Sequence, residues 1–460
     1  MAKTLGILLL LALAYGIYYA WQAFPIISGF GAKAMCSCVT LGGRTPQSVM
    51  EQELGSFPLS LGSFTYNPAD SSATGSVWGL ARRKAIYRPG LGCTLLVQTT
   101  EQELRSQTPA LPSLPSSAAA ADTLPWPLGN RLPDTLPGRL NISLLQTALD
   151  SAFAENPAAK KPKRTRAMVV VYKGQLVAER YADGFTAQSR HLGWSMTKSL
   201  TAALMGRLTL THGFNIMQPA PVPAWQMVTD GRQHITTQQL LQQASGLNFN
   251  ENYAGPADAT NMLYKQPDMA AFTAAKPLRE APGSRFYYSS GNSNILSRII
   301  RQTVGLQQYY TYAFEQLFYR LGMYSLVLEP DCSGTPVGSS YSWATARDWA
   351  RFGLLYLQNG QWQGEQLLPQ AFIEATRQPL PADSMRTYGY QFWLNAGPAS
   401  NPAARPYPAA PPDMYYADGY EHQYVFIIPS LQLVVVRLGQ SAAKQIGLNE
   451  VLGQIIAAVQ

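Results

Sequence analysis

The stretch Gly193-Trp194-Ser195-Met196-Thr197-Lys198-Ser199 predicts the start of a buried helix that carries a serine and, three residues later, a lysine. Residues three apart in a helix lie on the same face, so Ser195 Oγ and Lys198 Nζ are able to meet. Apolar residues continue at helical spacing and favour burial of that face (Leu200, Ala203, Leu204 and Leu208). An apolar setting lowers the pKa of a lysine, and a neutral amine is able to take the proton of a serine hydroxyl.

The same Ser-x-x-Lys pattern occurs a second time, at Ser441–Lys444. This copy follows the last strand-like run, and few residues come after it to supply further catalytic groups. We interpret it as the start of a surface helix. The pattern is therefore weak by itself, and the copy at Ser195 gains weight only from motifs farther along the chain.

The 460 residues carry a net charge of +8, with 46% hydrophobic and 13% charged residues, which is typical of a globular protein with a large core. Part of the positive charge lies in one run, which we interpret as a solvated rim before a strand, with contact to anionic lipid or cell-wall polymer as the alternative (Lys160, Lys161, Lys163, Arg164 and Arg166). Binding of nucleic acid is not expected, because no aromatic or glycine residues interleave with this run.

The sequence contains neither a metal-binding pattern nor the motif of a nucleophile elbow. The four histidines show no metal-ligand spacing, so we expect neither a metal nor another cofactor (His191, His212, His234 and His422). The chain also has no Gly-x-Ser-x-Gly motif, which argues against the nucleophile elbow of an α/β-hydrolase.

The N-terminal residues predict a membrane segment. The run from Thr4 to Ala32 has no charged residue, and about twenty apolar residues suffice to span a bilayer. We expect residues 1–30 to form an uncleaved single-pass anchor in the inner (cytoplasmic) membrane, with a cleaved signal as the alternative. The rest of the chain is then exported to the periplasm. Several aromatic residues suit an interfacial belt (Tyr15, Tyr18, Tyr19 and Trp21).

Three of the four cysteines, Cys36, Cys38 and Cys93, lie in the region after the anchor, and the fourth is Cys332. The spacing Cys36-Ser37-Cys38 is too tight for a zinc-ribbon pair. In an oxidising compartment we expect a disulfide from either Cys36 or Cys38 to Cys93.

Composition divides the remaining chain into three parts. Residues 31–105 predict a small accessory unit, with short strands at 63–66, 85–87 and 93–97 and a Gly/Ser-rich turn between the first two. Residues 106–140 are rich in Pro, Ala and Ser and predict a linker. Residues 141–460 predict the main domain, with a mostly helical half at roughly 196–355.

The main domain has a helix near each end and two Val/Ile-rich hairpins (helices 142–154 and 444–459; hairpins 167–172 with 175–181 and 423–428 with 431–438). The predicted fold class is α/β (α+β). An antiparallel sheet is flanked by helices and joined to the helical half, with a ligand cleft between the halves and a transmembrane helix at the N-terminus.

Two further motifs follow the serine and the lysine. In Tyr288-Ser289-Ser290 a turn presents a phenol just before a helix, and a tyrosine beside a protonated lysine ionises more easily than usual. In Ala417-Asp418-Gly419-Tyr420 a glycine lets substrate approach a strand edge, where the next backbone amide is able to bind an oxyanion.

In this order the three motifs resemble the serine β-lactamase and penicillin-binding-protein superfamily, most closely the branch around 6-aminohexanoate-dimer hydrolase. The resemblance runs roughly from Ala167 to the C-terminus and includes further segments (Leu240-Leu241, Ser245-Gly246-Leu247, Glu251 with Tyr253, Ala346 to Gly353, and Tyr388-Gly389-Tyr390 with Trp393). It implies that Ser195 is the acylated nucleophile, Lys198 its base and Tyr288 the proton relay. The backbone amides of Ser195 and Tyr420 would form the oxyanion hole.

The chain departs from the superfamily at two motifs. The Lys-Thr-Gly strand motif reads Ala417-Asp418-Gly419, so the cation that holds a β-lactam carboxylate is missing, and Ser290 stands where β-lactamases have an asparagine. Efficient β-lactam hydrolysis is therefore not expected. Other candidate substrate contacts are Gly419, His422 and residues of a loop over the cleft (Glu251, Tyr253 and Asp258). The alternatives are a structural hydrogen bond for His422 and solvent exposure for the loop.

The expected function is a serine hydrolase that cleaves a small amide or ester through an acyl-serine intermediate. A cell-wall peptide hydrolase of the D,D-carboxypeptidase kind is one alternative. The other is a catalytically dormant member that binds wall or membrane partners. The oligomeric state and the identity of the substrate stay open.

Overall fold

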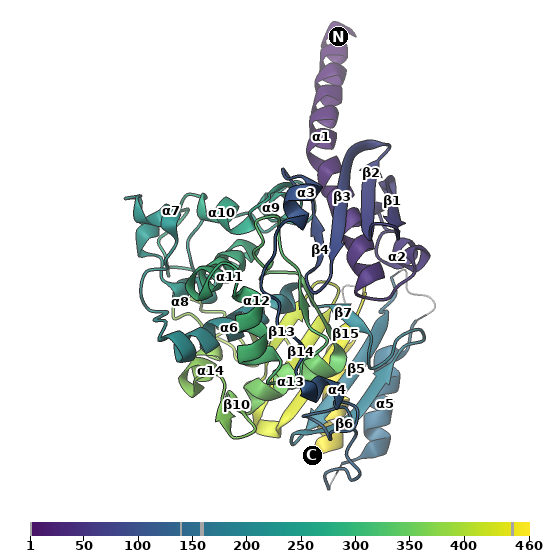
Figure 1. Ribbon diagram of the computed structural model, residues 1–460, viewed down its shortest axis with the longest axis vertical. Helices are drawn as coiled ribbons and strands as arrows, with labels where there is room; N and C mark the ends of the chain where they lie inside the picture. Colours follow the sequence, from purple (N-terminus) through teal and green to yellow (C-terminus); the bar gives the residue numbers. More distant parts are fainter. Residues whose placement is uncertain (1, 139, 157–160, 443–445) are drawn as a thin grey trace. The chain divides into compact units, whose positions relative to one another are not determined.

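The computed structural model describes residues 2–138, 140–156, 161–442 and 446–460 (Figure 1). The chain forms two compact units. Unit 1 comprises Met1–Gln107, Phe249–Thr273 and Glu329–Thr335, and unit 2 comprises Thr108–Asn248, Ala274–Leu328 and Pro336–Gln460. Two short segments from the predicted main domain thus belong with the N-terminal residues.

Unit 1 is built on the long helix α1 (Ala2–Thr40), which is long and apolar enough to cross a membrane. Its residues from Lys3 to Tyr19 are exposed, whereas most residues from Ile27 to Cys38 are buried. That length and composition fit a membrane anchor or a signal sequence alike. The buried half packs on a four-stranded antiparallel sheet in the order β1-β2-β3-β4 (Gly62–Asn67, Ser72–Val77, Leu80–Arg88 and Gly92–Leu95).

The strand predictions for this unit are confirmed at β1, β3 and β4, but the Gly/Ser-rich stretch expected as a turn forms strand β2. This stretch pairs with β1 on one side and β3 on the other, and glycine suits it because a Cβ on Gly75 would lie 2.4 Å from the carbonyl oxygen of Ser28 on α1. Only glycine allows the strand to come this near the helix. Short helices complete the unit (α2 Pro46–Gln52, η1 Leu59–Leu61, α3 Glu101–Arg105 and α9 Asp258–Lys265).

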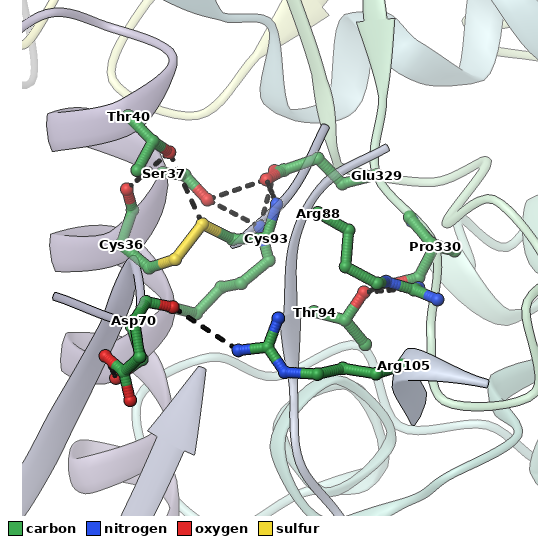
Figure 2. The surroundings of a disulfide bond; sticks show 12 residues. Cys36, Ser37, Thr40, Asp70, Arg88, Cys93, Thr94, Arg105, Glu329 and Pro330 are labelled. Carbon is green, nitrogen blue, oxygen red and sulfur yellow. Dashed lines mark hydrogen bonds and ion pairs between the residues drawn. A yellow bond between two sulfur atoms is a disulfide. The ribbon is translucent and has the colours of Figure 1, made fainter. Parts of the chain in front are cut away.

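A disulfide joins the helix to the sheet, between Cys36 on α1 and Cys93 on β4, with Cα atoms 6.1 Å apart (Figure 2). Cys38 and Cys332 are buried free thiols. Beside the disulfide, the buried carboxylate of Glu329 accepts hydrogen bonds from Ser37 Oγ (2.7 Å) and from the amide of Cys93 (2.7 Å).

Lys33 forms an ion pair with the same carboxylate. Its Nζ also donates to Ser37 Oγ at 2.8 Å. Burial lowers the pKa of Lys33, and the charge of Glu329 opposes that shift. The C-terminal half of α1 is therefore an integral part of the core of unit 1.

Unit 2 contains a six-stranded antiparallel sheet in the order β12-β13-β14-β15-β5-β6 (Trp393–Leu394, Tyr415–Gly419, Gln423–Ile428, Leu433–Gly439, Thr165–Tyr172 and Gln175–Tyr181). Both predicted hairpins are confirmed. Helices α5 (Ile142–Phe153) and α15 (Leu448–Val459) cover one face, and α13 (Ala346–Leu357) packs on the other. Gly353 on α13 permits this contact, because a Cβ there would lie 2.6 Å from Val434.

The rest of unit 2 is mainly helical, as predicted (α4 Ser116–Ala119, α6 Thr197–His212, α7 Pro223–Gln226, η3 Arg232–His234, α8 Thr237–Leu241, α11 Ser290–Val304, α12 Tyr309–Ala313, η4 Phe314–Phe318 and α14 Gln370–Thr376; η5 Pro429–Leu431 is a turn of the large sheet). α10 (Met269–Ala274) begins in unit 1 and ends at the first residue of the next segment of unit 2. Two small sheets add β7-β9-β8 and β10-β11 (Arg190–Leu192, Ser342–Thr345 and Val327–Leu328; Gln361–Trp362 and Glu365–Gln366).

The second Ser-x-x-Lys copy does not begin a surface helix at its serine. Ser441 is buried and accepts a hydrogen bond from Arg437 at 2.6 Å, and α15 starts only at Leu448. Lys444 lies outside the described residues.

Candidate active site

Ser195 lies in a tight turn, where a short 3₁₀ segment (η2, Trp194–Met196) precedes helix α6. Trp194 has a φ of 47°, a left-handed conformation that is costly for a bulky residue. Gly193 donates its amide to the carbonyl of Ser342 at 2.7 Å, and a Cβ on it would lie 2.6 Å from Trp349. The backbone before Ser195 is thus held in a strained shape by close packing on both sides.

Lys198 is completely buried one turn later on α6. Its Nζ lies 3.0 Å from Ser195 Oγ, 3.0 Å from Ser290 Oγ and 2.9 Å from the carbonyl oxygen of Ser339. The amine therefore bridges the turn before α6, the first residue of α11 and the loop before β9. Ser290, considered from the sequence as a substrate contact, here accepts a hydrogen bond from the lysine. The carbonyl of Ser339 has no counterpart in the sequence prediction, since nothing in a sequence singles out a backbone oxygen.

Tyr288 places its ring beside the same amine, with Lys198 Nζ 4.9 Å from the ring centroid. Two other aromatic side chains fix this ring. Trp393 stacks on it with centroids 5.2 Å apart, and Tyr388 meets it edge-on at 5.8 Å. The three side chains that the sequence singled out, Ser195, Lys198 and Tyr288, thus lie together in unit 2.

The turn between β13 and β14 lies against the Ser195 turn. A Cβ on Gly419 would be 2.2 Å from the carbonyl oxygen of Gly193, so only glycine fits there. The rings of Trp194 and Tyr420 meet edge-on with centroids 5.5 Å apart. These contacts bring the backbone at Tyr420 next to the backbone at Ser195.

The same turn contains two successive left-handed residues, Glu421 with a φ of 63° and His422 with a φ of 64°. Arg437 holds both, since its Nη1 donates to the carbonyls of Glu421 at 3.2 Å and His422 at 2.7 Å. Arg437 is itself completely buried, and this burial lowers its pKa to about 9. Sequence reasoning missed Arg437, although a charge within the apolar run Leu433 to Leu438 was a usable signal.

His422 and Asp418 lie on either side of the Gly419–Tyr420–Glu421 turn. His422 Nδ1 lies 3.3 Å from Tyr424 Oη, which is a hydrogen bond within the sheet. Burial raises the pKa of Asp418 to about 7, and the charge of Lys198 opposes that shift. Asp418 therefore changes charge near neutral pH within electrostatic reach of the buried amine.

The loop candidates Glu251, Tyr253 and Asp258 belong to unit 1. Tyr253 donates its hydroxyl to Glu251 at 2.8 Å, and Asp258 accepts the amide of Asn250 at 2.9 Å. Their role toward a substrate stays a prediction. Across the described parts of the chain, no group of three or more His, Cys, Asp and Glu side chains is arranged to hold a metal ion.

Comparison with known proteins matches residues 152–447 to the family named Beta-lactamase. The chain belongs to the β-lactamase family of serine hydrolases. The family resemblance seen in the sequence is thereby confirmed.

A curated relative and two solved structures illustrate this membership. The 6-aminohexanoate-dimer hydrolase of Paenarthrobacter ureafaciens is 24% identical over 242 residues, which is 49% of this chain and 60% of that enzyme. The match thus spans less than two thirds of that relative. A Bacillus anthracis protein assigned as a 6-aminohexanoate-dimer hydrolase is 24% identical, with a TM-score of 0.56 over 71% of this chain and 86% of its own.

A family VIII carboxylesterase has a TM-score of 0.54 at 14% identity, over 72% of this chain and all of its own. At these identities the two structures establish the fold alone. The mixed α/β, β-lactamase-like fold predicted from the sequence is therefore confirmed.

Proposed function

We propose that this protein cleaves an amide or ester bond of a small molecule through an acyl intermediate on Ser195. The observation that carries the proposal is the 3.0 Å contact between Ser195 Oγ and the fully buried Lys198 Nζ. A lysine in such surroundings loses hydration of its charged form, which favours the neutral amine that a general base needs.

In the first step the neutral amine of Lys198 takes the proton of Ser195 Oγ, and the oxygen attacks the substrate carbonyl. Negative charge develops on the carbonyl oxygen, and the backbone N–H groups of Ser195 and Tyr420 donate to it. The contact of Gly419 with Gly193 supports this pairing, because it brings the two amides close.

The leaving group then departs with a proton relayed from Lys198 through Tyr288, whose ring lies 4.9 Å from the amine. A water molecule attacks the resulting ester, and the same groups act in reverse to release the acid and restore Ser195. In this scheme Ser290 holds the lysine in place as well as lining the site, since its hydroxyl accepts from Nζ at 3.0 Å.

The choice of amides and esters follows from the relatives. One hydrolyses the 6-aminohexanoate dimer by name, and another is named a carboxylesterase. Efficient β-lactamase activity is not expected, because Ala417 stands at the first position of the strand motif, where a lysine elsewhere holds the β-lactam carboxylate. Gly419, His422, Glu251, Tyr253 and Asp258 remain proposed substrate contacts.

Labelling with a fluorophosphonate, followed by intact mass, tests the nucleophile. The wild-type chain should gain one adduct, and Ser195→Ala should gain none. Ser441→Ala is the matched control, because it removes the serine of the other Ser-x-x-Lys copy and should keep the adduct. An adduct retained by folded Ser195→Ala, or none on the wild type, would refute the assignment. A panel of short amides and esters then identifies the substrate class.

A further inference from the structure

Apolar and basic side chains of unit 1 lie near the point where the exposed part of α1 ends. We call this group the collar and define it by six residues (Trp21, Trp78, Leu80, Arg82, Arg83 and Lys265). The exposed helix from Thr4 to Trp21 is about 27 Å long at about 1.5 Å per residue. This length is close to the roughly 30 Å hydrocarbon core of a bilayer.

Two contacts connect the collar to α1 just after its exposed part ends. The rings of Phe24 and Trp78 meet edge-on with centroids 5.3 Å apart. Lys265 Nζ donates to the side chain of Gln22 at 2.7 Å. The turn between β2 and β3 accordingly lies beside α1 where the helix leaves the sheet (Figure 1).

The turn between β2 and β3 has a sequence that does not favour its backbone conformation. Trp78 and Gly79 join β2 to β3 with φ values of 51° and 79°, a turn that favours asparagine or aspartate followed by glycine. A tryptophan in the first position adopts a costly conformation. It is nevertheless 69% exposed, and Leu80 next to it is 61% exposed. The contact with Phe24 therefore covers only a small part of the Trp78 side chain.

Within the described part of the chain, the positive charges of the collar are not balanced by nearby negative charges. Among the described residues, no carboxylate lies within ion-pair distance of Arg82, Arg83 or Lys265. Burial lowers the pKa of Lys265, and the nearby charge of Arg83 lowers it further. A cluster of like charges beside exposed aromatic groups suits a surface that is apolar on one side and anionic on the other.

We propose that the collar is a second membrane contact, in which Trp78 and Leu80 enter the lipid interface while Arg82, Arg83 and Lys265 face anionic headgroups. The inference rests on α1 spanning the membrane and does not depend on the chemistry at Ser195. Its consequence is that unit 1 is fixed against the bilayer at two places. A single helix with a flexible connection would leave it free to swing, but here α1 runs unbroken from the apolar stretch into the core of unit 1.

The test uses the full chain in nanodiscs with an environment-sensitive fluorophore at Leu80→Cys. Ala69→Cys is the matched control, because Ala69 is an exposed residue on the turn at the opposite end of β2. The two native free thiols, Cys38 and Cys332, are buried, and labelling of the unmodified chain measures their background. Lipids that carry a quencher near the headgroup, or deep in the acyl chains, report the depth of the label.

At position 80 we expect blue-shifted emission and quenching by the shallow lipid at least about twofold stronger than at position 69, since interfacial groups lie about 5–10 Å into the boundary region. Quenching should weaken in nanodiscs of neutral lipid and in Arg82→Gln/Arg83→Gln. Equal, weak quenching at both positions would overturn the proposal. So would a blue shift without lipid quenching, which would indicate a protein partner, and indifference to lipid charge would overturn the role of the basic residues.

Discussion

Replacing Asp418 by asparagine tests how the end of strand β13 affects the charge on Lys198, the proposed base. The Asp418 side chain is largely buried at the end of β13, and burial raises its pKa from 3.8 to about 7. Its ionised form would face the phenols of Tyr407, Tyr416 and Tyr424 on one side and Lys198 on the other. Asparagine has nearly the same shape and no charge at any pH.

The direction in which the free energy of unfolding changes with pH follows from which state of the chain binds the proton. Below pH 3.8 the carboxyl holds its proton in both the folded and the unfolded chain, so it does not affect stability through its charge. From there up to about pH 7 only the folded chain keeps the proton, and the free energy of unfolding falls. The full shift corresponds to about 4 kcal/mol, at about 1.4 kcal/mol for each pH unit. Asp418→Asn should therefore be more stable than the wild type above neutral pH by up to that amount.

Thermal unfolding of both proteins between about pH 5 and pH 8.5 measures this difference. We expect the gap in Tm to widen by several degrees between pH 5 and about pH 7 and to level off above that, because 1 kcal/mol shifts Tm by about 2–4 °C in a large domain. The rate of fluorophosphonate labelling should respond in the same range. An ionised Asp418 favours the protonated form of Lys198, so above pH 7 the variant should react faster than the wild type. A gap in Tm that is independent of pH, or a variant that is less stable at pH 8, would refute the reasoning.

Gly419→Ala should slow labelling about 100-fold without unfolding the protein, because its Cβ would meet the Gly193 carbonyl at 2.2 Å and displace the Tyr420 amide; Gly138→Ala, whose Cβ meets nothing within 4 Å, is the control. Arg437→Met should lower the free energy of unfolding by about 3 kcal/mol and also slow fluorophosphonate labelling, because the carbonyls of Glu421 and His422 lose their donor. A variant that is less stable but is labelled at the normal rate would contradict the idea that Arg437 positions the turn beside Ser195. Lys33→Met should cost about 3–5 kcal/mol in thermal unfolding by leaving a buried carboxylate unpaired, and adding Glu329→Gln should recover part of the loss; no recovery would argue against the ion pair.

Local patterns in the sequence predicted the large sheet correctly. Strands β5 and β15 are runs of valine, and such runs seldom form anything but buried strands. The N-cap at Asn141 was also readable, because its side chain accepts the amide of Leu144. The order of the three motifs then sufficed to identify the family.

The sequence did not reveal features that depend on long-range packing. Strand β2 has the composition of a turn, yet it pairs with β1 and β3, and its Gly75 lies against Ser28 on α1. The segment Glu329–Thr335 joins unit 1 through the contacts of the Glu329 carboxylate with residues almost 300 positions earlier in the chain. Arg437 holds the turn at Tyr420 through backbone carbonyls, and no side-chain pattern reports such contacts.

Among the described residues, the buried lysines Lys33 and Lys198 differ in their surroundings, and this difference bears on the proposed role of Lys198 as a base. Both donate to a serine hydroxyl, Lys33 to Ser37 at 2.8 Å and Lys198 to Ser195 at 3.0 Å. Burial lowers the pKa of Lys33, and the paired carboxylate of Glu329 opposes that shift by favouring the charged amine. The charges of Lys198 and Asp418 reach each other, and burial raises the pKa of that carboxyl to about 7. Lys33 thus forms an ion pair with a carboxylate, whereas the carboxyl that acts on Lys198 changes charge near neutral pH, which suits the proposed role of Lys198 as a base that releases and regains a proton in each turnover.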